Sequence, residues 1–440
     1  MTLEQAELAL ADAELGMGEV QYVYNESETE SVCSQFPAVN AVCPAGFSVV
    51  LYYNLSGTKY SGGTGTAEDP YQIATVSDLR QLGYTISDYN KCFIITADID
   101  MSGYSFNKAL IAFDGTSDAI GFTGSFDGGG HVISNLSILG SSCCGLFGII
   151  GVDGVVKNLG LIDSNVSNGI YIGSICGYNK GSIANCYANG YVKGSSVVGG
   201  LCGFNDCGYI SNSFSIGMVV GSYNLGGFCG KNKDGIISNC YSGSQIFPDY
   251  GMNQGGFCGI QSGENAVSSD CIWDTEASGF SDGFGQYAGT VTNVIGKTTA
   301  EMQSLATYVD MGWDFTSEDG DPADWYYVSG SYPIPAWEVV FTMPDLTGMT
   351  LAQAQDRLAE NNIVPTIQYN NSDLPENALL DYSPSAGESC TSEEVILYVS
   401  NGIMKYSGGS GTPDMPYLIS DVYELFLMSY PAVDYDKHFK

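Results

Sequence analysis

The 440-residue sequence predicts a mainly β protein, in which a parallel β-solenoid with coils of about 27 residues is flanked by small α+β domains. Three observations lead to this fold class. Two columns of equivalent residues recur at the coil pitch, a large unit begins again late in the chain, and the composition is rich in glycine and tyrosine. With 57 glycines and 30 tyrosines, short strands joined by tight turns are expected.

The coil pitch is read from residues 140–275. Glycine-rich rungs recur there as GLFG (145–148), GSICG (173–177), GGLCG (199–203), GGFCG (226–230) and GGFCG (255–259). From Cys176 the rung cysteines follow at steps of 26, 27 and 29 residues. The second column consists of Asn158, Asn185, Asn212 and Asn239 at steps of 27, then Asp270 after 31. Because both columns keep nearly the same pitch, each coil returns to the same place and pairs with its neighbours, as a β-solenoid requires.

The large unit starts with KYSGGTGTAEDPYQI at Lys59 and again with KYSGGSGTPDMPYLI at Lys405, 346 residues later. Upstream of each start, VVLYYNLSG (49–57) pairs with VILYVSNG (395–402). The predicted domains are residues 1–57, a solenoid with a C-terminal cap at 58–340, a small domain at 341–402, and the start of a second solenoid unit at 403–440.

Residues 59–337 resemble the GLUG-repeat proteins of bacterial surfaces. The motifs that carry this resemblance are DIDMSG (98–103), FTGSFDGGGHVISNLSI (122–138), GLFGIIGVDGVVKNLGL (145–161) and SYPIPAW (331–337). The resemblance implies a β-solenoid at a cell surface. Cysteine in the later rungs, where an aliphatic residue is usual, departs from the family pattern.

Residues 341–402 resemble a PASTA domain, through MPDLTGMTLAQAQDRLAENNI, a Pro-Ser-Ala-Gly turn and the strand EEVILYVS. Thr350 and Gln353 predict a capping box, and Leu351, Ala354 and Leu358 one apolar helix face. Residues 1–57 repeat this pattern as a PASTA-like domain without its first strand, the counterpart of Met343–Gly348. Because MTLEQAEL aligns with the internal MTLAQAQD, we expect Met1 to be an internal residue of a longer protein. The resemblance implies contact with peptidoglycan or another glycan.

The charge balance excludes several functions. The chain carries 49 acidic and 14 basic residues, a net charge of −35, which repels phosphate, so nucleic acid and anionic membranes are not expected partners. No apolar run has the roughly 18 residues of a membrane-spanning helix. Arg80 is the only arginine of the predicted solenoid, and Asp98 and Asp100 have no basic partner that would make a lyase-like site. His131 is expected to form hydrogen bonds within the first coils. The sequence therefore predicts no enzyme and no catalytic residue.

Seven of the fourteen cysteines occupy the two columns: Cys176, Cys186, Cys202, Cys229, Cys240, Cys258 and Cys271. One interpretation is an internal ladder of small buried side chains. The other is disulfide bonding in an oxidising exterior. Stacked Cα atoms about 4.8 Å apart lie within the disulfide range, but parallel in-register Cβ atoms are slightly too far apart, so a bond would need a local shift or a partner from the other column. Cys33 and Cys43 form a plausible local pair.

Two further groups are candidate binding residues. The segment SEDGDPAD (317–324) places Glu318, Asp319, Asp321 and Asp324 close enough to hold Ca²⁺, the one cofactor considered, although a solvated loop is the alternative. Tyr187, Phe214 and Tyr241 follow the asparagine column at matching places. They would form either a glycan-facing aromatic row or an ordinary stack of rings.

Taken together, the sequence predicts a non-enzymatic structural segment of a secreted or cell-surface tandem-repeat protein of bacterial type. Solenoid and PASTA-like modules would continue end to end as an extracellular fibre or stalk. Its partners would be adjacent repeats, by self-association or covalent continuation, and peptidoglycan or another glycan. The alternative is an adhesin that grips cell-wall or surface polysaccharide.

Overall fold

The structure is a computed structural model. It describes residues 3–24, 31–37, 41–55, 59–113, 121–315, 325–338, 341–359, 363, 365–370, 372, 374–386, 389–390, 395–402, 412–414, 416 and 418–419. The chain divides into two compact units. The first contains Met1–Trp313 and Tyr327–Pro335, and the second contains Asp314–Tyr326 and Ala336–Lys440. Most of the segment predicted to start a second solenoid, 403–440, lies outside the described residues.

The first unit begins with a small α+β module. It contains α1 (Leu3–Asp12), β1 (Gly16–Tyr24), β2 (Ser31–Phe36) and β3 (Ser48–Leu55). The central strand β3 pairs in parallel with β1 and antiparallel with β2. Ala6 on the helix packs with Val49 and Leu51 on β3, so one apolar face of α1 covers the sheet.

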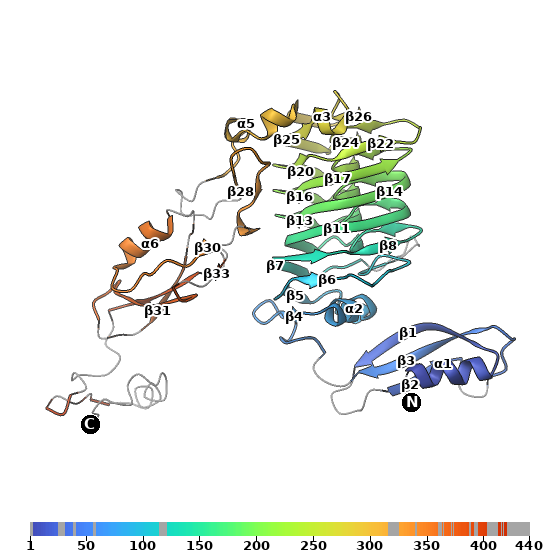
Figure 1. The fold of residues 1–440 in the computed structure, drawn as a ribbon, viewed down its shortest axis with the longest axis horizontal. Coiled ribbons are helices and arrows are strands. Elements are labelled where there is room, and N and C mark those ends of the chain that lie inside the picture. Colours follow the sequence, from blue (N-terminus) through green and yellow to red (C-terminus); the bar gives the residue numbers. More distant parts are fainter. Residues whose placement is uncertain are drawn as a thin grey trace. The chain divides into compact units, whose positions relative to one another are not determined.

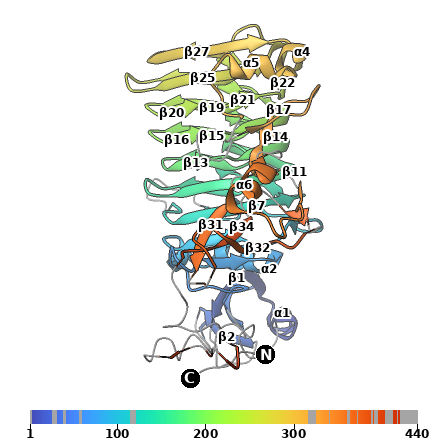
Figure 2. The same ribbon diagram turned by 90° about the vertical axis from the view of Figure 1, so that its left-hand side faces the viewer.

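A parallel β-solenoid follows, with its coils stacked one above the other (Figures 1 and 2). One wall is a parallel sheet of β10 (Phe147–Ile150), β12 (Cys176–Asn179), β15 (Cys202–Asp206), β19 (Cys229–Lys233), β24 (Cys258–Ser262) and β26 (Phe284–Tyr287). Successive coils pair in register, so that Cys176 lies opposite Cys202, and Cys229 lies opposite both Cys202 and Cys258. The predicted fold class is confirmed.

The remaining walls consist of strands that also pair coil to coil in parallel. They are β4 (Tyr71–Ile73), β5 (Cys92–Ile95), β6 (Ile99–Asp100), β7 (Ser125–Ser134), β8 (Ser137–Leu139), β9 (Cys143–Cys144), β11 (Val155–Ile172), β13 (Ser182–Ala184), β14 (Tyr187–Gly199), β16 (Tyr209–Ser211), β17 (Phe214–Gly221), β18 (Leu225–Gly226), β20 (Ile236–Ser238), β21 (Tyr241–Ser242), β22 (Gln245–Pro248), β23 (Gln254–Gly255), β25 (Val267–Asp274) and β27 (Thr290–Lys297). The core between the walls is apolar, with Phe228 and Phe257 stacked at 5.1 Å between ring centroids.

Short helices lie at both ends of the solenoid (Figures 1 and 2). At the first coils, α2 (Val76–Tyr84) is followed by the 3₁₀ turn η1 (Ile86–Asp88), and Thr75 with Asp78 forms a capping box. At the last coils lie α3 (Thr275–Ser278), α4 (Thr299–Met302) and α5 (Leu305–Val309). These helices lie beside the terminal strands, since α2 contacts β4 and both α3 and α4 contact β27.

The asparagine column of the sequence marks one corner of every coil. Its members have a left-handed backbone, with φ between 46° and 59°, at Asn135, Asn158, Asn185, Asn212, Asn239, Asp270 and Asn293. Asn and Asp tolerate this conformation better than other residues with a side chain. The amides also bond along the stack, since Asn185 Nδ2 donates to Asn158 Oδ1 at 3.2 Å.

A second, fully buried amide ladder was not predicted. The Nδ2 of Asn179 donates to Oδ1 of Asn205 at 2.8 Å, and the Nδ2 of Asn205 donates to Oδ1 of Asn232 at 2.9 Å. The Nδ2 of Asn232 in turn lies 3.3 Å from Oε1 of Gln261. Each of these side chains is at most 1% exposed. The ladder fastens the turns after four consecutive strands of one wall.

Departures from the 27-residue pitch are absorbed outside the paired strands or at a bulge. The chain has two more residues between Pro248 and Gln254 than between their partners Gly221 and Leu225. Three coils earlier, β11 has an extra residue, Asp163, opposite β14, and its φ is 51°. Such a bulge inserts one residue while pairing continues on either side.

The second unit contains a small α+β module whose sheet has the same topology as the first module. It contains β30 (Phe341–Thr342), α6 (Leu351–Ala359), β31 (Thr366–Asn370), β32 (Leu379–Ser383), β33 (Ser389–Cys390) and β34 (Ile396–Ser400). The central β34 pairs in parallel with β31 and antiparallel with β32, as β3 does with β1 and β2. Ala354 and Leu358 of α6 pack on Leu397 and Val399. Three short elements precede this module: β28 (Trp325–Tyr326), β29 (Ile334–Pro335) and η2 (Ala336–Glu338).

The start of this module differs in one detail from the prediction. The capping box is confirmed, because Thr350 N donates to Oε1 of Gln353 at 2.9 Å and Gln353 N to Oγ1 of Thr350 at 3.3 Å. The first strand, however, is Phe341–Thr342 rather than Met343–Gly348. Pro344 has no N–H for a ladder and Gly348 turns the chain with φ 75°, so this stretch is irregular.

The amide ladder yields a test of what aligns the coils. In Asn205→Ala, Asn179 loses its amide acceptor and Asn232 loses its donor, both in a dry interior. We expect the free energy of unfolding to fall by about 2 kcal/mol or more, measured by urea unfolding followed by circular dichroism. Asn189→Ala, at an exposed position on β14, is the matched control. Equal denaturation midpoints for the two variants would contradict a stabilising role for the ladder.

Candidate functional site

The column cysteines are buried thiols. All seven are free in the structure and fully buried. Five of these thiols donate to a carbonyl oxygen two residues away in the chain, as Cys240 Sγ does to Ser238 O at 3.0 Å. Burial raises the pKa of Cys186 to about 12. Cys43 is also a free thiol, and the side chain of its predicted partner, Cys33, lies outside the described part.

The predicted glycan-facing aromatic row is wrong, because its rings are covered. Tyr187, Phe214 and Tyr241 are 4%, 3% and 0% exposed. They stack face to face, with centroids 4.9 Å and 4.6 Å apart. Tyr332 stacks on Tyr241 at 5.7 Å, and the Tyr241 hydroxyl donates to Pro333 O at 2.7 Å. The alternative interpretation, an ordinary stack of rings, describes them.

The residues considered for catalysis have structural partners. Asp98 Oδ1 accepts a hydrogen bond from Val132 N at 3.0 Å and lies 3.1 Å from Nδ1 of His131. Asp100 accepts hydrogen bonds from Asn135 Nδ2 at 2.8 Å and from Ser102 N at 2.9 Å. These bonds, that from Asn135 first, lower the pKa of Asp100. Both carboxylates therefore fasten turns of the first coils.

Two findings concern metals and membranes. Within the described ranges, no three His, Cys, Asp or Glu side chains gather in a way that would hold a metal ion. The acidic segment of the Ca²⁺ prediction (Glu318, Asp319, Asp321, Asp324) lies outside these ranges, so that prediction stands as made. None of the described helices is both long and apolar enough to span a bilayer.

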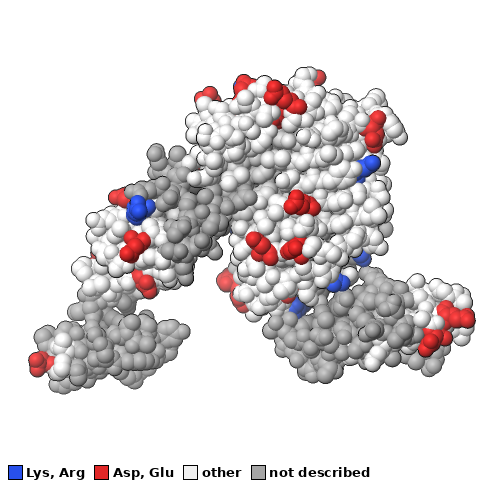
Figure 3. All heavy atoms as spheres, in the orientation of Figure 1, with Lys and Arg blue, Asp and Glu red and all other residues white. Residues whose placement is uncertain are grey.

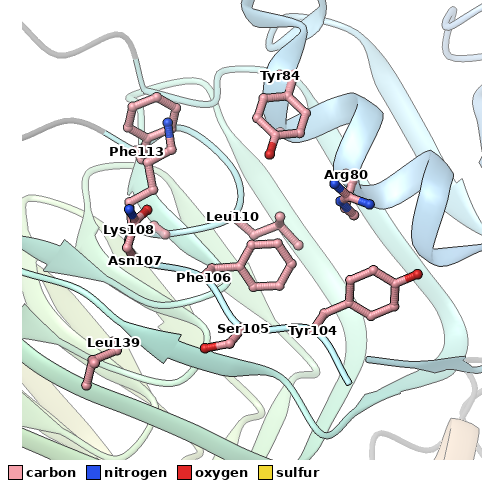
Figure 4. Close-up of a pocket in the computed structure, with 12 residues that line it drawn as sticks. Arg80, Tyr84, Tyr104, Ser105, Phe106, Asn107, Lys108, Leu110, Phe113 and Leu139 are labelled. Carbon is pink, nitrogen blue, oxygen red and sulfur yellow. The ribbon is translucent and has the colours of Figure 1, made fainter. Parts of the chain in front are cut away.

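A cleft with a volume of about 410 Å³ opens beside the first coils (Figure 4). Its walls come from three places in the chain: Arg80, Gly83 and Tyr84 on α2, residues 104–110 and Phe113 after β6, and Leu139 on β8. Four of the lining residues are aromatic and two are basic. Among the lining residues that the structure describes, none is acidic, in a chain with 49 Asp and Glu.

The buried hydroxyl of Tyr89 holds two walls of this cleft together. It donates to Gly83 O at the end of α2 at 2.9 Å and accepts from Ala112 N at 3.0 Å. Gly83 allows the close approach, because a Cβ there would clash with the carbonyl oxygen of Leu110. On the other side, Phe106 is fixed to β8 by bonds of 2.9 Å to Ser137 O and 2.7 Å from Leu139 N. The cleft is therefore a preformed feature of the solenoid end.

The cleft has a positive group at each side and apolar surface between them. The Arg80 guanidinium lies 5.4 Å from the ring centroid of Tyr104, and the Lys108 ammonium lies 3.2 Å from that of Phe113. Phe106 and Leu110 lie between these two pairs (Figure 4). The Nε of Arg80 is buried but has no hydrogen-bond partner, and no described carboxylate pairs with this arginine. An anionic molecule with a flat apolar face matches this arrangement.

Sequence reasoning singled out Arg80 as a lone arginine but missed the cleft. The signal that could have found it is YSFNKALIAF (104–113), an aromatic and basic stretch in an acidic chain. This stretch is separated from α2 by about 25 residues of sequence. The two come together only when the first coil forms, and no local sequence pattern shows that contact.

Comparison with known proteins assigns one part of the chain to a family. Residues 341–401 match the PASTA domain model. Halomucin of Haloquadratum walsbyi is 36% identical over 170 residues, covering 36% of this chain and 2% of halomucin. A protein of Evansella cellulosilytica, provisionally named a Gly-rich membrane protein, is 29% identical over 154 residues, covering 33% of this chain and 18% of that protein. The chain thus spans a small fraction of the curated relatives it matches.

Among solved structures, a Bacteroides ovatus protein provisionally named an immunoglobulin A1 protease is similar to this chain. The identity is 22%, the TM-score is 0.45, and the match covers 64% of this chain and 96% of the other. The GLUG-type resemblance of residues 59–337 stays a prediction.

The state of the column thiols can be tested by alkylation and mass spectrometry. We expect iodoacetamide to modify the exposed Cys207 in the folded chain and the seven column cysteines only after unfolding. Because burial raises the pKa of Cys186 from 9.0 to about 12, its contribution to stability is complete below pH 9 and declines as the pH rises from 9 to 12. An intact mass lower by two hydrogens per bond would instead show disulfides in the ladder.

The Tyr89 clamp can be tested by Tyr89→Phe. The substitution keeps the ring but leaves Gly83 O without its donor and Ala112 N without its acceptor. We expect the stability of the first coils to fall by about 1–3 kcal/mol, seen as faster hydrogen exchange at the Ala112 amide. Tyr104→Phe, at the exposed rim of the same cleft, is the matched control. Unchanged exchange at Ala112 in Tyr89→Phe would show that the hydroxyl does not hold the wall.

Proposed function

We propose that this chain is a non-catalytic, stiff spacer of a cell-surface protein in which β-solenoids alternate with PASTA-like modules. The observation that carries the proposal is the shared topology of the two small modules before and after the solenoid. In both, a helix covers a sheet whose central strand pairs in parallel on one side and antiparallel on the other. The match of residues 341–401 to the PASTA model supports the same identity for residues 3–55.

Stiffness is supported by the way the coils are joined. Backbone ladders run from coil to coil along the solenoid, and columns of amides, thiols and rings repeat at each step. In a solenoid each repeat is held by contacts with its neighbours, so a continuous ladder resists bending and stretching along its length. The unit that begins at Lys59 starts again at Lys405, which supports continuation into adjacent repeats as the fibre or stalk.

A location outside the cell is supported by charge and by the relatives. A net charge of −35 keeps a surface protein soluble and apart from the anionic membrane below it. PASTA domains are known to bind peptidoglycan, and one relative is named a membrane protein. These points favour a surface segment of a bacterial or archaeal envelope, anchored by parts of the protein other than the solenoid.

The absence of catalysis in this proposal rests on the partners of the candidate residues. Asp98, Asp100 and His131 are engaged in fastening turns, and the thiols of the two columns are enclosed by the core. The adhesin alternative, as it was predicted, depended on an exposed row at Tyr187, Phe214 and Tyr241. Since these rings are buried, the spacer is the better supported of the two.

Surface display can be tested on the organism that makes the protein. An antibody raised against residues 59–313 should label intact cells, and brief treatment of the cells with proteinase K should remove the label. Antibody to a cytoplasmic protein is the control for cell integrity. Labelling that requires permeabilised cells would overturn the surface assignment.

A further inference from the structure

We propose that the cleft beside the first coils binds a carboxylate-bearing sugar, with Arg80 as the anion-binding residue and Tyr104 and Phe106 as the surface for the sugar ring. The choice of a sugar rests on the proposed function, because a surface segment meets the polysaccharides of the envelope. The choice of an anion rests on the cleft alone. Its volume of about 410 Å³ lies within the range of roughly 300–1,000 Å³ usual for small-molecule sites.

The first argument is the state of Arg80. Its side chain lines the cleft, and no described carboxylate pairs with it. A guanidinium presents its N–H groups in a planar fork that matches the two oxygens of a carboxylate. Tyr104, at 5.4 Å, lies against the cation and holds it toward the cleft. A ligand carboxylate in the cleft would give this guanidinium the charge partner that no described residue provides.

The second argument is the distribution of charge. Acidic residues are scattered over the face of the molecule shown in Figure 3, and basic residues are few. The described part of the cleft lining departs from this pattern, since it contains Arg80 and Lys108 and no acidic residue among those residues. Although the whole chain repels anions at long range, fields near a hollow are set by the charges that line it.

The third argument is the apolar surface between the charges. Tyr104 is 41% exposed, and Phe106 lies half-buried beside it over Leu110. A uronate ring has a face of C–H groups that can lie on an aromatic ring while its carboxylate points sideways. Ser105 and Asn107, on the same segment, offer exposed polar groups for sugar hydroxyls. A purely apolar or a purely anionic ligand would leave part of this lining unused.

The test is calorimetric titration of the full 440-residue chain with oligogalacturonate. The fully methyl-esterified oligosaccharide, which has the same ring without the charge, and a sulfated oligosaccharide are the comparison ligands. We expect oligogalacturonate to bind, the ester to bind at least about tenfold more weakly, and added salt to weaken binding. Arg80→Gln and Tyr104→Ala should each reduce the affinity about tenfold or more.

Lys193→Gln is the matched control, because it removes the same charge from an exposed position on β14 and should leave binding unchanged. Thermal unfolding of Arg80→Gln is measured to show that this variant is folded. Tyr104→Ala, at an exposed position, is a second cleft variant, so that the test does not depend on Arg80→Gln alone. No binding of oligogalacturonate, equal binding of the ester, or an unchanged affinity in both cleft variants would overturn the proposal. Binding of the sulfated ligand alone would overturn the carboxylate assignment. Each of these results leaves the cell-labelling test of the proposed function unaffected.

Discussion

The structure depends on the requirement that each coil pair in register with the coils on either side. In a parallel ladder every backbone N–H and C=O of one strand needs a partner at the equivalent position of a neighbouring coil. A buried group that lacks this partner reduces the stability of the fold. Once the strands are in register, equivalent side chains stack as well. This single constraint accounts for the thiol, amide and aromatic columns, which otherwise have little chemistry in common.

Each column has a structural role that depends on where it lies in the coil. Inside, small thiols such as Cys202 and Cys229 fit a place that recurs with little room to spare. At the corners, Asn and Asp adopt the left-handed turn, and their amides and carboxylates form hydrogen bonds along the stack. Outside one wall, Tyr187, Phe214 and Tyr241 stack, and the cap of the solenoid contacts the last of these rings through Tyr332. Extra residues are tolerated only where pairing is interrupted, as between Pro248 and Gln254.

The ends of the solenoid are where this regularity stops, and the candidate binding site is found at one of them. There α2 lies beside β4. The segment 104–113 runs between α2 and β8 without belonging to a regular strand. An irregular segment of this kind can hold side chains at angles that a ladder does not allow, such as Arg80 facing Tyr104. The proposed ligand site would thus lie on a connecting segment of the proposed spacer. Binding residues are often found on such segments, which a rigid scaffold holds in place.

The sequence by itself determined the solenoid, its pitch and the small domain at 341–402, because these depend on patterns that repeat along the chain. It also identified the column cysteines and the turn asparagines, whose spacing equals the pitch. The tertiary structure decided which columns are covered: Tyr187, Phe214 and Tyr241 are all buried, and Tyr241 is in contact with Tyr332, which is distant in sequence. It also revealed the amide ladder of Asn179 and Asn205 and the cleft at Arg80. These depend on how turns and cap segments meet in space, and a side chain's neighbours across coils cannot be read from its own stretch of chain.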